Sequence, residues 1–294
     1  MMKTTGPDGL LIRNFSIKRI SSFRIGGIAR SYYIPGDISG LLRFLKQARE
    51  TNSDYYIVGN ASNILFNDRM YKGTLISLKG FTNYIQLEKD GVTAGASLAL
   101  DTAVDLCIGN SFKGLEKLSG IPGSIGGALV MNAGAFGSEI GDCVEWVKVL
   151  THLGRFRTLL KKEINFTYRK AEPLEKYIIL EAKLRLKKGQ KKDLLKIRRD
   201  ILKKRQKNQP LEYPSCGSIF KRPENNFAGT LIEKAGLKGF RIGGAEVSRK
   251  HANFIINRGK ASARDVSQLM DVIRGEVHKM SGIILEPEIK FFNF

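Results

Sequence analysis

The clearest periodic segment lies near the N-terminus, at residues 36–52. Four aliphatic residues there share one face of a helical projection, and basic residues occupy the opposite face. The four are Ile38, Leu41, Leu42 and Leu45. Residues 29–34 alternate between apolar and polar side chains, and residues 55–58 form a short apolar run, so each predicts a strand. A strand, a helix and a strand joined by short links predict a small α/β unit.

The rest of the chain predicts a β-rich middle and further helices. Apolar runs bounded by turn residues predict strands at 73–78, 84–87, 91–94, 144–150, 155–159 and 177–186. Helical spacing predicts helices at 99–110, 187–207 and 262–281, and a final strand is expected at 287–292. The dipeptide Gln209-Pro210 marks a natural boundary after the third of these helices.

The length and composition indicate a globular protein of more than one unit. The chain has 294 residues, 42% of them hydrophobic, and at about 100–200 residues per domain two or three units are expected. No apolar run approaches the roughly 18 residues that a membrane span needs, and the first residues lack the pattern of a signal peptide. We therefore expect a cytoplasmic protein that does not bind a membrane.

The cysteines and histidines predict no metal site. Cys107, Cys143 and Cys216 are odd in number and widely spaced, and no Cys-x-x-Cys pair occurs. The three histidines do not complete a zinc pattern with them. Scattered free thiols are typical of a reducing compartment.

The formal net charge of +21 suggests nucleic-acid binding as an alternative function. The excess is densest at residues 187–207, where apolar residues recur at near-helical spacing. A basic stretch of an amphipathic helix is more often a solvated face than a binding surface. We therefore favour an enzyme over a nucleic-acid-binding protein and expect no nucleic-acid partner.

A glycine-rich segment, residues 118–137, is the most unusual part of the sequence. Its six glycines leave the backbone bare, so N–H groups could approach a phosphate closely. The segment matches neither the dinucleotide-binding G-x-G-x-x-G nor the P-loop. On its own it predicts a phosphate-binding loop and a tightly packed structural loop about equally.

Two further segments, residues 23–29 and 58–65, add glycines and amides beside predicted strands. Together, the motifs resemble those of the UDP-N-acetylenolpyruvoylglucosamine reductase family over about residues 15–292. The matching segments are Arg24-Ile-Gly-Gly27, Gly59-Asn-Ala-Ser-Asn63, Gly120-Ile-Pro-Gly-Ser-Ile-Gly-Gly127, Met131-Asn-Ala-Gly134, Tyr168-Arg169, residues 214–223, residues 243–254 and Leu285-Glu-Pro-Glu288.

The resemblance implies an α+β fold. Two subdomains form an FAD-binding fold of the vanillyl-alcohol-oxidase/p-cresol methylhydroxylase type, and a C-terminal α+β domain binds substrate. We expect these parts at residues 1–72, 73–208 and 209–294, with the alternative that the final strand returns to the first subdomain. The implied cofactor-binding residues are Arg24, Gly26, Gly27, Gly59, Asn60, Ala61, Ser62, Asn63, Gly120, Pro122, Gly123, Ser124, Gly126, Gly127, Asn132, Ala133 and Gly134.

The resemblance also implies a reaction: NADPH reduces FAD, and the flavin reduces the enolpyruvyl ether of UDP-N-acetylglucosamine. Arg169 matches the arginine that holds the substrate carboxylate, Ser218 the serine that donates a proton, and Glu288 the glutamate that assists. Periodicity alone does not choose between Glu286 and Glu288, because residues two apart share a face of a strand.

The remaining expectations concern ligands and cellular role. The candidate substrate-binding residues are Lys221, Arg222, Lys250, His251 and Asn253. The partner is a UDP-sugar, the chain is expected to be a monomer, and the length is that of the shorter form of the family. The implied process is peptidoglycan precursor synthesis, and through it cell-wall biogenesis, cell shape and cell division. A different FAD oxidoreductase, acting on a small alcohol or hydroxy acid, is the alternative enzyme.

Overall fold

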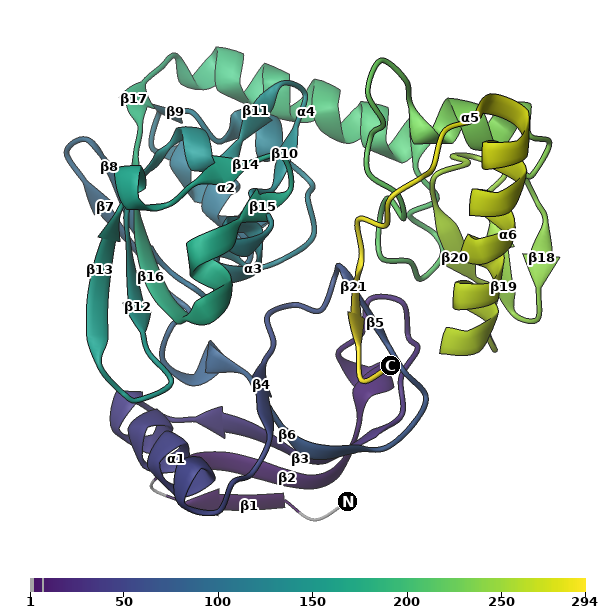
Figure 1. Ribbon diagram of the computed structural model, residues 1–294. Helices are drawn as coiled ribbons and strands as arrows, with labels where there is room; N and C mark the ends of the chain where they lie inside the picture. The colour runs from purple at the N-terminus through teal and green to yellow at the C-terminus, as the bar shows by residue number, and fades with distance from the viewer. Residues whose placement is uncertain (1–2, 7) are drawn as a thin grey trace. The chain divides into compact units, whose positions relative to one another are not determined.

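The computed structural model describes residues 3–6 and 8–294, which form two compact units (Figure 1). Unit 1 comprises Met1–Phe15, Arg30–Asn60 and Lys72–Lys203, and unit 2 comprises Ser16–Ala29, Ala61–Tyr71 and Lys204–Phe294. Both units are discontinuous in sequence. The three-part division expected at residues 72 and 208 stays a prediction.

A five-stranded sheet near the N-terminus has the strand order β1-β2-β3-β6-β4. Its strands are β1 (Lys3–Gly6), β2 (Gly9–Ser16), β3 (Ile28–Pro35), β6 (Tyr71–Ile76) and β4 (Tyr55–Ile57). Helix α1 (Ile38–Glu50) begins after Asp37, whose Oδ1 accepts a 2.7 Å hydrogen bond from the Gly40 N–H. Leu41 and Leu45 of its predicted apolar face are buried, so this helix and its orientation are confirmed.

A second five-stranded sheet in unit 1 is antiparallel throughout, in the order β13-β12-β16-β8-β7. Its strands are β13 (Phe156–Leu160), β12 (Val144–Leu150), β16 (Ile178–Arg185), β8 (Gly91–Gly95) and β7 (Ile85–Glu88). The main core of unit 1 packs helices α2 (Leu100–Gly109) and α3 (Ile125–Val130) against this sheet.

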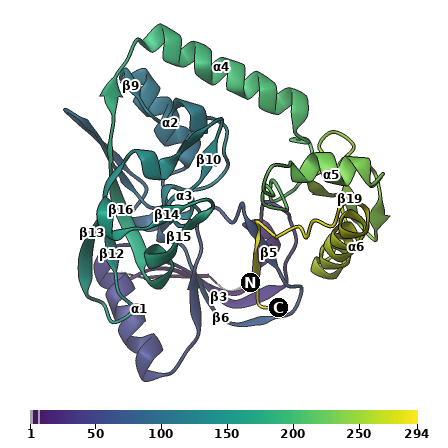
Figure 2. The same ribbon diagram turned by 45° about the horizontal axis from the view of Figure 1, so that its top comes forward.

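Short strand pairs complete unit 1, and a long helix begins in unit 1 and ends in the first residues of the last segment of unit 2. The pairs are β9 (Phe112–Lys113) with β17 (Lys187–Lys188), β10 (Gly134–Ala135) with β11 (Ser138–Glu139), and β14 (Phe166–Thr167) with β15 (Lys170–Ala171). Helix α4 (Lys191–Asn208) runs alongside α2 in both ribbon views (Figures 1 and 2). It buries Leu194 and Ile201, while its cations lie mostly at the surface, as the sequence predicts.

Unit 2 is built around helix α6 (Ala263–Ser281) and the small sheet β18-β19-β20. Strands β18 (Arg241–Ile242), β19 (Ala245–Val247) and β20 (Ile255–Asn257) are antiparallel, and helix α5 (Ala228–Lys234) joins the same core. Ser262 and Asp265 form a capping box at the start of α6, and Gly282, at a φ of +70°, ends it.

The C-terminal strand β21 (Lys290–Phe292) pairs in parallel with β5 (Ile64–Phe66), so the chain end lies beside a segment from the first quarter of the sequence. Short 3-10 helices lie at Ile17–Arg19, Leu78–Gly80, Glu116–Leu118, Ile140–Asp142, Lys161–Glu163 and Glu172–Lys176.

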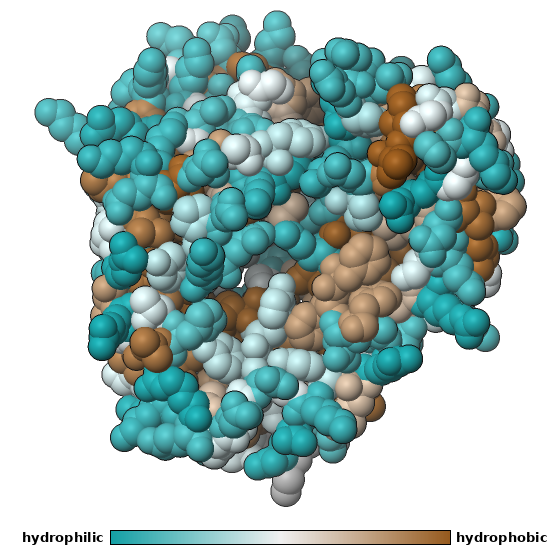
Figure 3. Space-filling view, viewed as in Figure 1, coloured by the Kyte–Doolittle hydropathy of each residue, from teal (hydrophilic) through white to brown (hydrophobic). Residues whose placement is uncertain are grey.

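The observed mixture of helices and sheets confirms the predicted α+β class. Strands β1 and β2 and helices α3 and α5 were not predicted from the sequence. Within the described part of the chain, no helix is both long and apolar enough to cross a bilayer. Figure 3 shows a face on which hydrophilic side chains predominate, in keeping with the 26% of charged residues.

Candidate active site

The glycine-rich segment folds in unit 1 as a loop followed by α3. The Ser124 hydroxyl accepts a 3.3 Å bond from the Gly127 N–H and so caps this helix. A Cβ at Gly59 would lie 2.4 Å from the Ser124 Oγ, so the Gly59 and Ser124 motifs are in direct contact. The Gly126 N–H donates to the Ala96 carbonyl at 2.8 Å. Glycine at positions 59 and 126 therefore permits close packing of predicted cofactor-binding segments.

Asp101 anchors the start of the same loop. Its Oδ1 accepts from the Gly120 N–H at 2.7 Å, and its two oxygens accept from Arg198 at 2.7 and 3.0 Å. The hydrogen bonds with Asp101 raise the pKa of Arg198. Gly120 and Gly123 have φ values of +73° and +142°, which favour glycine. The amides of Gly120, Gly126 and Gly127 thus donate within the protein. Asp101 was not among the residues predicted for the site.

The predicted catalytic Arg169 lies at the turn of the β14–β15 hairpin, with a φ of +57°. Its Nη2 donates to the Gly134 carbonyl at 3.0 Å, and its guanidinium lies 4.8 Å from the centre of the Tyr168 ring. The structure therefore brings Arg169 beside Gly134 of the predicted cofactor-binding set. Arg169 as a residue is partly buried, and a guanidinium suits pairing with an anion in such a position.

Ser218 and Glu288 lie in unit 2 on neighbouring extended segments. The Glu288 N–H donates to the carbonyl of Ile219, the residue after Ser218, at 2.8 Å. On the other side, Ser218 forms a bridge with Phe254. A Cβ at Gly217 would meet nothing within 4 Å, but its φ of +76° favours glycine there. Two of the three predicted catalytic residues are thus brought together by backbone pairing.

The two glutamates of the Leu285–Glu288 motif have different surroundings. The side chain of Glu286 is 70% exposed and pairs with Lys221 at 3.1 Å, whereas Glu288 is half-buried. The Asn63 side chain donates to the Glu288 carbonyl at 3.1 Å, and the Asn63 carbonyl accepts from Lys290 N–H at 2.9 Å. Predicted cofactor residue Asn63 therefore holds the backbone that carries Glu288, which favours Glu288 as the functional carboxylate.

The Arg24–Gly27 motif packs tightly in unit 2. A Cβ at Gly26 would lie 2.9 Å from Ile17, and one at Gly27 would lie 2.4 Å from the Asp68 carbonyl. Arg24 is exposed with a φ of +54°, and Ala61 of the second motif has a φ of +49°. The Ala61 carbonyl accepts from the N–H of Ser22, two residues before the first motif, at 3.3 Å, so the second motif adjoins the segment that leads into the first.

The five candidate substrate-binding residues all lie in unit 2, and each has a protein partner. Lys250 donates to the Gln206 carbonyl at 2.7 Å, and Arg222 lies 4.2 Å over the Phe227 ring. Their roles in binding a diphosphate stay predictions.

Asn253 is buried and holds Phe220 on both sides, because its Oδ1 accepts from the Phe220 N–H and its Nδ2 donates to the Phe220 carbonyl. His251 accepts at Nδ1 from the Asn253 N–H at 3.3 Å, and burial lowers its pKa. Both residues therefore support the segment that carries Ser218.

Among residues 3–6 and 8–294, no three or more His, Cys, Asp or Glu side chains are grouped to hold a metal ion. All three cysteines are free thiols.

Comparison with known proteins identifies the family. The profile described as "FAD binding domain" matches residues 29–160, and that described as "UDP-N-acetylenolpyruvoylglucosamine reductase, C-terminal domain" matches residues 209–292. The reductase of Caldanaerobacter subterraneus subsp. tengcongensis is 40% identical over 96% of this chain and 94% of its own length. That of Clostridium tetani is 39% identical over 94% of this chain and 90% of its own length.

A solved structure agrees with the sequence relatives. The crystal structure of UDP-N-acetylenolpyruvylglucosamine reductase from Thermus caldophilus superposes with a TM-score of 0.83 at 31% identity, covering 99% of this chain and 100% of that chain. The likeness spans both matched profiles and every motif of the sequence. The chain belongs to the UDP-N-acetylenolpyruvoylglucosamine reductase family.

Proposed function

We propose that the protein reduces the enolpyruvyl ether of UDP-N-acetylglucosamine to UDP-N-acetylmuramate, with FAD as bound cofactor and NADPH as hydride donor. The observation that carries the proposal is the 40% identity to a curated reductase over 96% of the chain. The FAD-binding profile covers residues 29–160, and the C-terminal profile of the reductase family covers Ser218 and Glu288.

The cofactor motifs form glycine-rich turns in both units, which suits a long ligand, and the amides of Gly120, Gly126 and Gly127 in them donate within the protein. Gly59 lies against Ser124 in unit 1, and the Arg24–Gly27 and Ala61–Asn63 segments adjoin each other in unit 2. When bound, FAD supplies the transfer of hydride from NADPH to the substrate, which is chemistry that no side chain here provides.

Arg169 binds the carboxylate of the enolpyruvyl group in this proposal. Negative charge develops on that side of the substrate as the vinyl carbon is reduced, and a fixed guanidinium stabilises it. The bond to the Gly134 carbonyl orients the guanidinium without neutralising its charge, because a carbonyl is an uncharged acceptor.

Ser218 donates the proton that completes the lactyl ether. A serine hydroxyl is a weak acid, but the α-carbon of the enolate formed by hydride addition is strongly basic, so a positioned donor is sufficient. Glu288 lies on the adjacent segment and assists at the proton-transfer site. Glu286 does not share this role, because it is exposed and paired with Lys221.

The cellular setting follows from the same proposal. UDP-N-acetylmuramate is a precursor of peptidoglycan, so the activity contributes to cell-wall biogenesis and through it to cell shape and division. The protein works as a cytoplasmic monomer that binds a UDP-sugar, without a nucleic-acid or membrane partner.

An anaerobic spectral titration tests the proposal. The purified holoprotein should show oxidised-flavin bands that bleach with NADPH and return when enolpyruvyl-UDP-N-acetylglucosamine is added. Bands that bleach but return only with oxygen would show that the protein is a flavoenzyme that does not reduce this substrate. A protein that neither carries nor takes up FAD would overturn the proposal.

A further inference from the structure

Asn132 lies in the glycine-rich segment, but its side chain faces the protein. The residue is 1% exposed and has a φ of +41°, in the left-handed region that asparagine tolerates better than most residues. Its Nδ2 donates to the Glu139 carboxylate at 2.6 Å and to the Thr167 carbonyl at 3.0 Å, and its Oδ1 accepts from the Gly141 N–H at 3.1 Å. The Asn132 amide thus donates two hydrogen bonds and accepts one, all with groups of this chain.

The partners fix the orientation of this amide. A backbone N–H can only donate, whereas a carbonyl and a carboxylate accept, so the Oδ1 must face Gly141 and the Nδ2 must face Thr167 and Glu139. No other common side chain of this size has two donors and an acceptor in one plane. An aspartate here would place a second carboxylate against Glu139.

Two of the three partners, Thr167 and Glu139, connect Asn132 to Arg169. Thr167 precedes Arg169 by two residues on the same tight hairpin. Glu139 is the strand partner of Gly134, and the Gly134 carbonyl accepts from the Arg169 guanidinium at 3.0 Å. Asn132 thus holds both the hairpin that carries Arg169 and the strand that orients its side chain.

The packing around Asn132 leaves it little freedom. A Cβ at Gly141 would lie 2.7 Å from the Asn132 Oδ1 and 2.8 Å from Phe166, and one at Gly134 would lie 2.7 Å from Glu139. A side chain at position 134 or 141 would displace these neighbours, so glycine at both positions permits the close approach of the segments that Asn132 bridges.

We propose that Asn132, together with Glu139, is a positioning residue for Arg169: it sets the guanidinium at the place where it binds the substrate carboxylate. The inference rests on the proposed role of Arg169. It assigns to Asn132 a function distinct from direct cofactor contact by its side chain, because the amide is occupied by Glu139, Thr167 and Gly141.

The test compares two ligands that differ in the group that Arg169 binds. UDP-N-acetylglucosamine lacks the carboxylate that enolpyruvyl-UDP-N-acetylglucosamine carries. The dissociation constant of UDP-N-acetylglucosamine divided by that of enolpyruvyl-UDP-N-acetylglucosamine therefore reports how much the carboxylate contributes to binding. The ratio is measured on the oxidised holoprotein from the change in the flavin spectrum, without turnover. Asn132→Ala should lower it by about tenfold or more, since a displaced guanidinium loses a charge-assisted bond.

A double-mutant cycle separates positioning from general damage. In an Arg169→Ala background, Asn132→Ala should change the ratio by less than about twofold, because the group through which it acts is gone. Glu139→Gln keeps an acceptor for Asn132 and should retain the ratio, whereas Glu139→Ala should lower it. Asn110→Ala is the matched control, because that side chain bonds only the Leu106 carbonyl of its own helix among the contacts described.

The outcomes are distinguishable. An unchanged ratio in Asn132→Ala, or an equal fall with and without Arg169, would overturn the inference. If Asn132→Ala does not retain flavin, Glu139→Ala against Glu139→Gln gives the same test, and equal ratios in that pair would also overturn it. A wild-type protein that fails to reduce the enolpyruvyl sugar would instead refute the proposed function.

Discussion

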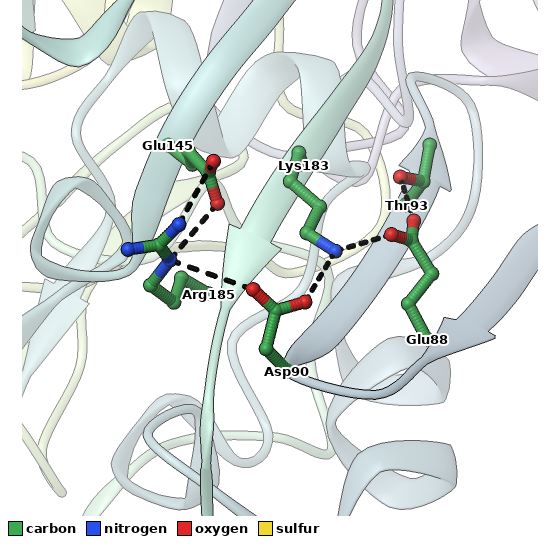
Figure 4. A network of polar contacts seen from close by, with 6 residues as sticks. All are labelled: Glu88, Asp90, Thr93, Glu145, Lys183 and Arg185. Atoms are coloured by element: carbon green, nitrogen blue, oxygen red, sulfur yellow. Dashed lines mark hydrogen bonds and ion pairs between the residues drawn. The ribbon is translucent and has the colours of Figure 1, made fainter.

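Lys183 is the centre of a network on the second sheet of unit 1, and its removal gives a measurable prediction (Figure 4). This ammonium lies on the central strand β16 in a residue that is only 5% exposed, and it bonds to Glu88 and to Asp90, the latter at 2.9 Å. Thr93 supports Glu88 through a 2.5 Å hydrogen bond. A buried cation with two carboxylate partners is stable in this position only while those partners are ionised.

Substituting Lys183 by methionine keeps most of the aliphatic stem but removes the charge. The two carboxylates are 41% and 53% exposed, so they recover part of their hydration, and the cost is less than for a fully buried pair. We expect the free energy of unfolding to fall by about 1–3 kcal/mol. The matched control is Lys148→Met, which removes a 45% exposed lysine from the same sheet and should cost less than about 1 kcal/mol.

Trp146 provides the assay, because it is the only tryptophan and is the direct strand partner of Lys183. Urea unfolding of wild type and both variants, followed by Trp146 fluorescence, gives the free energy of unfolding with a probe that lies within this sheet. A Lys183→Met variant as stable as wild type, or no less stable than Lys148→Met, would refute the reasoning.

The pH dependence adds a second check. Hydrogen bonds from Lys183 lower the pKa of both Glu88 and Asp90, so their stabilisation is present above their unfolded pKa of about 4 and is lost as the pH falls through the folded pKa. Burial alone would lower the pKa of Lys183, but its bonds to the two carboxylates raise the pKa, so this stabilisation persists to above about pH 10. The difference between wild type and Lys183→Met should therefore be largest between these limits and shrink below about pH 4.

Three further predictions concern the site, the thiols and a helix cap. Ser218→Ala should leave flavin reduction by NADPH unchanged and slow reoxidation by the enolpyruvyl sugar by about 10²–10⁴-fold in stopped-flow measurements; normal reoxidation would remove the serine from the mechanism. Burial raises the pKa of Cys216 and Cys107 to about 12 and that of Cys143 to about 11, so a thiol reagent at neutral pH should label none of them in the folded protein and all three after denaturation. Ser262→Ala, which removes the cap of α6, should cost about 1 kcal/mol in urea unfolding, and no loss would show that the cap is dispensable.

Elements with strong periodicity could be predicted from the sequence. Helix α1 has a continuous apolar face, and helical spacing extends over residues 262–281, so the predicted ends of α1 and α6 lie within two residues of those observed. In contrast, α3 has two consecutive glycines and only six residues, which disfavour a helix locally. Its formation depends on tertiary contacts, such as the bond from Gly126 to the Ala96 carbonyl, that no local pattern reveals.

The candidate site also has features that the sequence predicts and features that it does not. The identity of Arg169, Ser218 and Glu288 came from motifs, but the contact between Arg169 and Gly134 joins residues 35 apart and depends on the hairpin turn. Periodicity left Glu286 and Glu288 equivalent, whereas in the structure Glu286 is exposed and paired with Lys221 and Glu288 is half-buried. The net positive charge of the sequence does not show which basic side chains bind substrate and which bind the protein itself. In the structure, the Lys250 ammonium donates to the Gln206 carbonyl.

Product analysis is the most direct test that the protein reduces the enolpyruvyl sugar. The holoprotein is incubated with NADPH and enolpyruvyl-UDP-N-acetylglucosamine without oxygen, and the sugar nucleotide is weighed by mass spectrometry while NADPH consumption is followed. We expect a product heavier by two hydrogens, identical to UDP-N-acetylmuramate, formed in equal amount to the NADPH consumed. NADPH consumption without a change in the sugar nucleotide would contradict it.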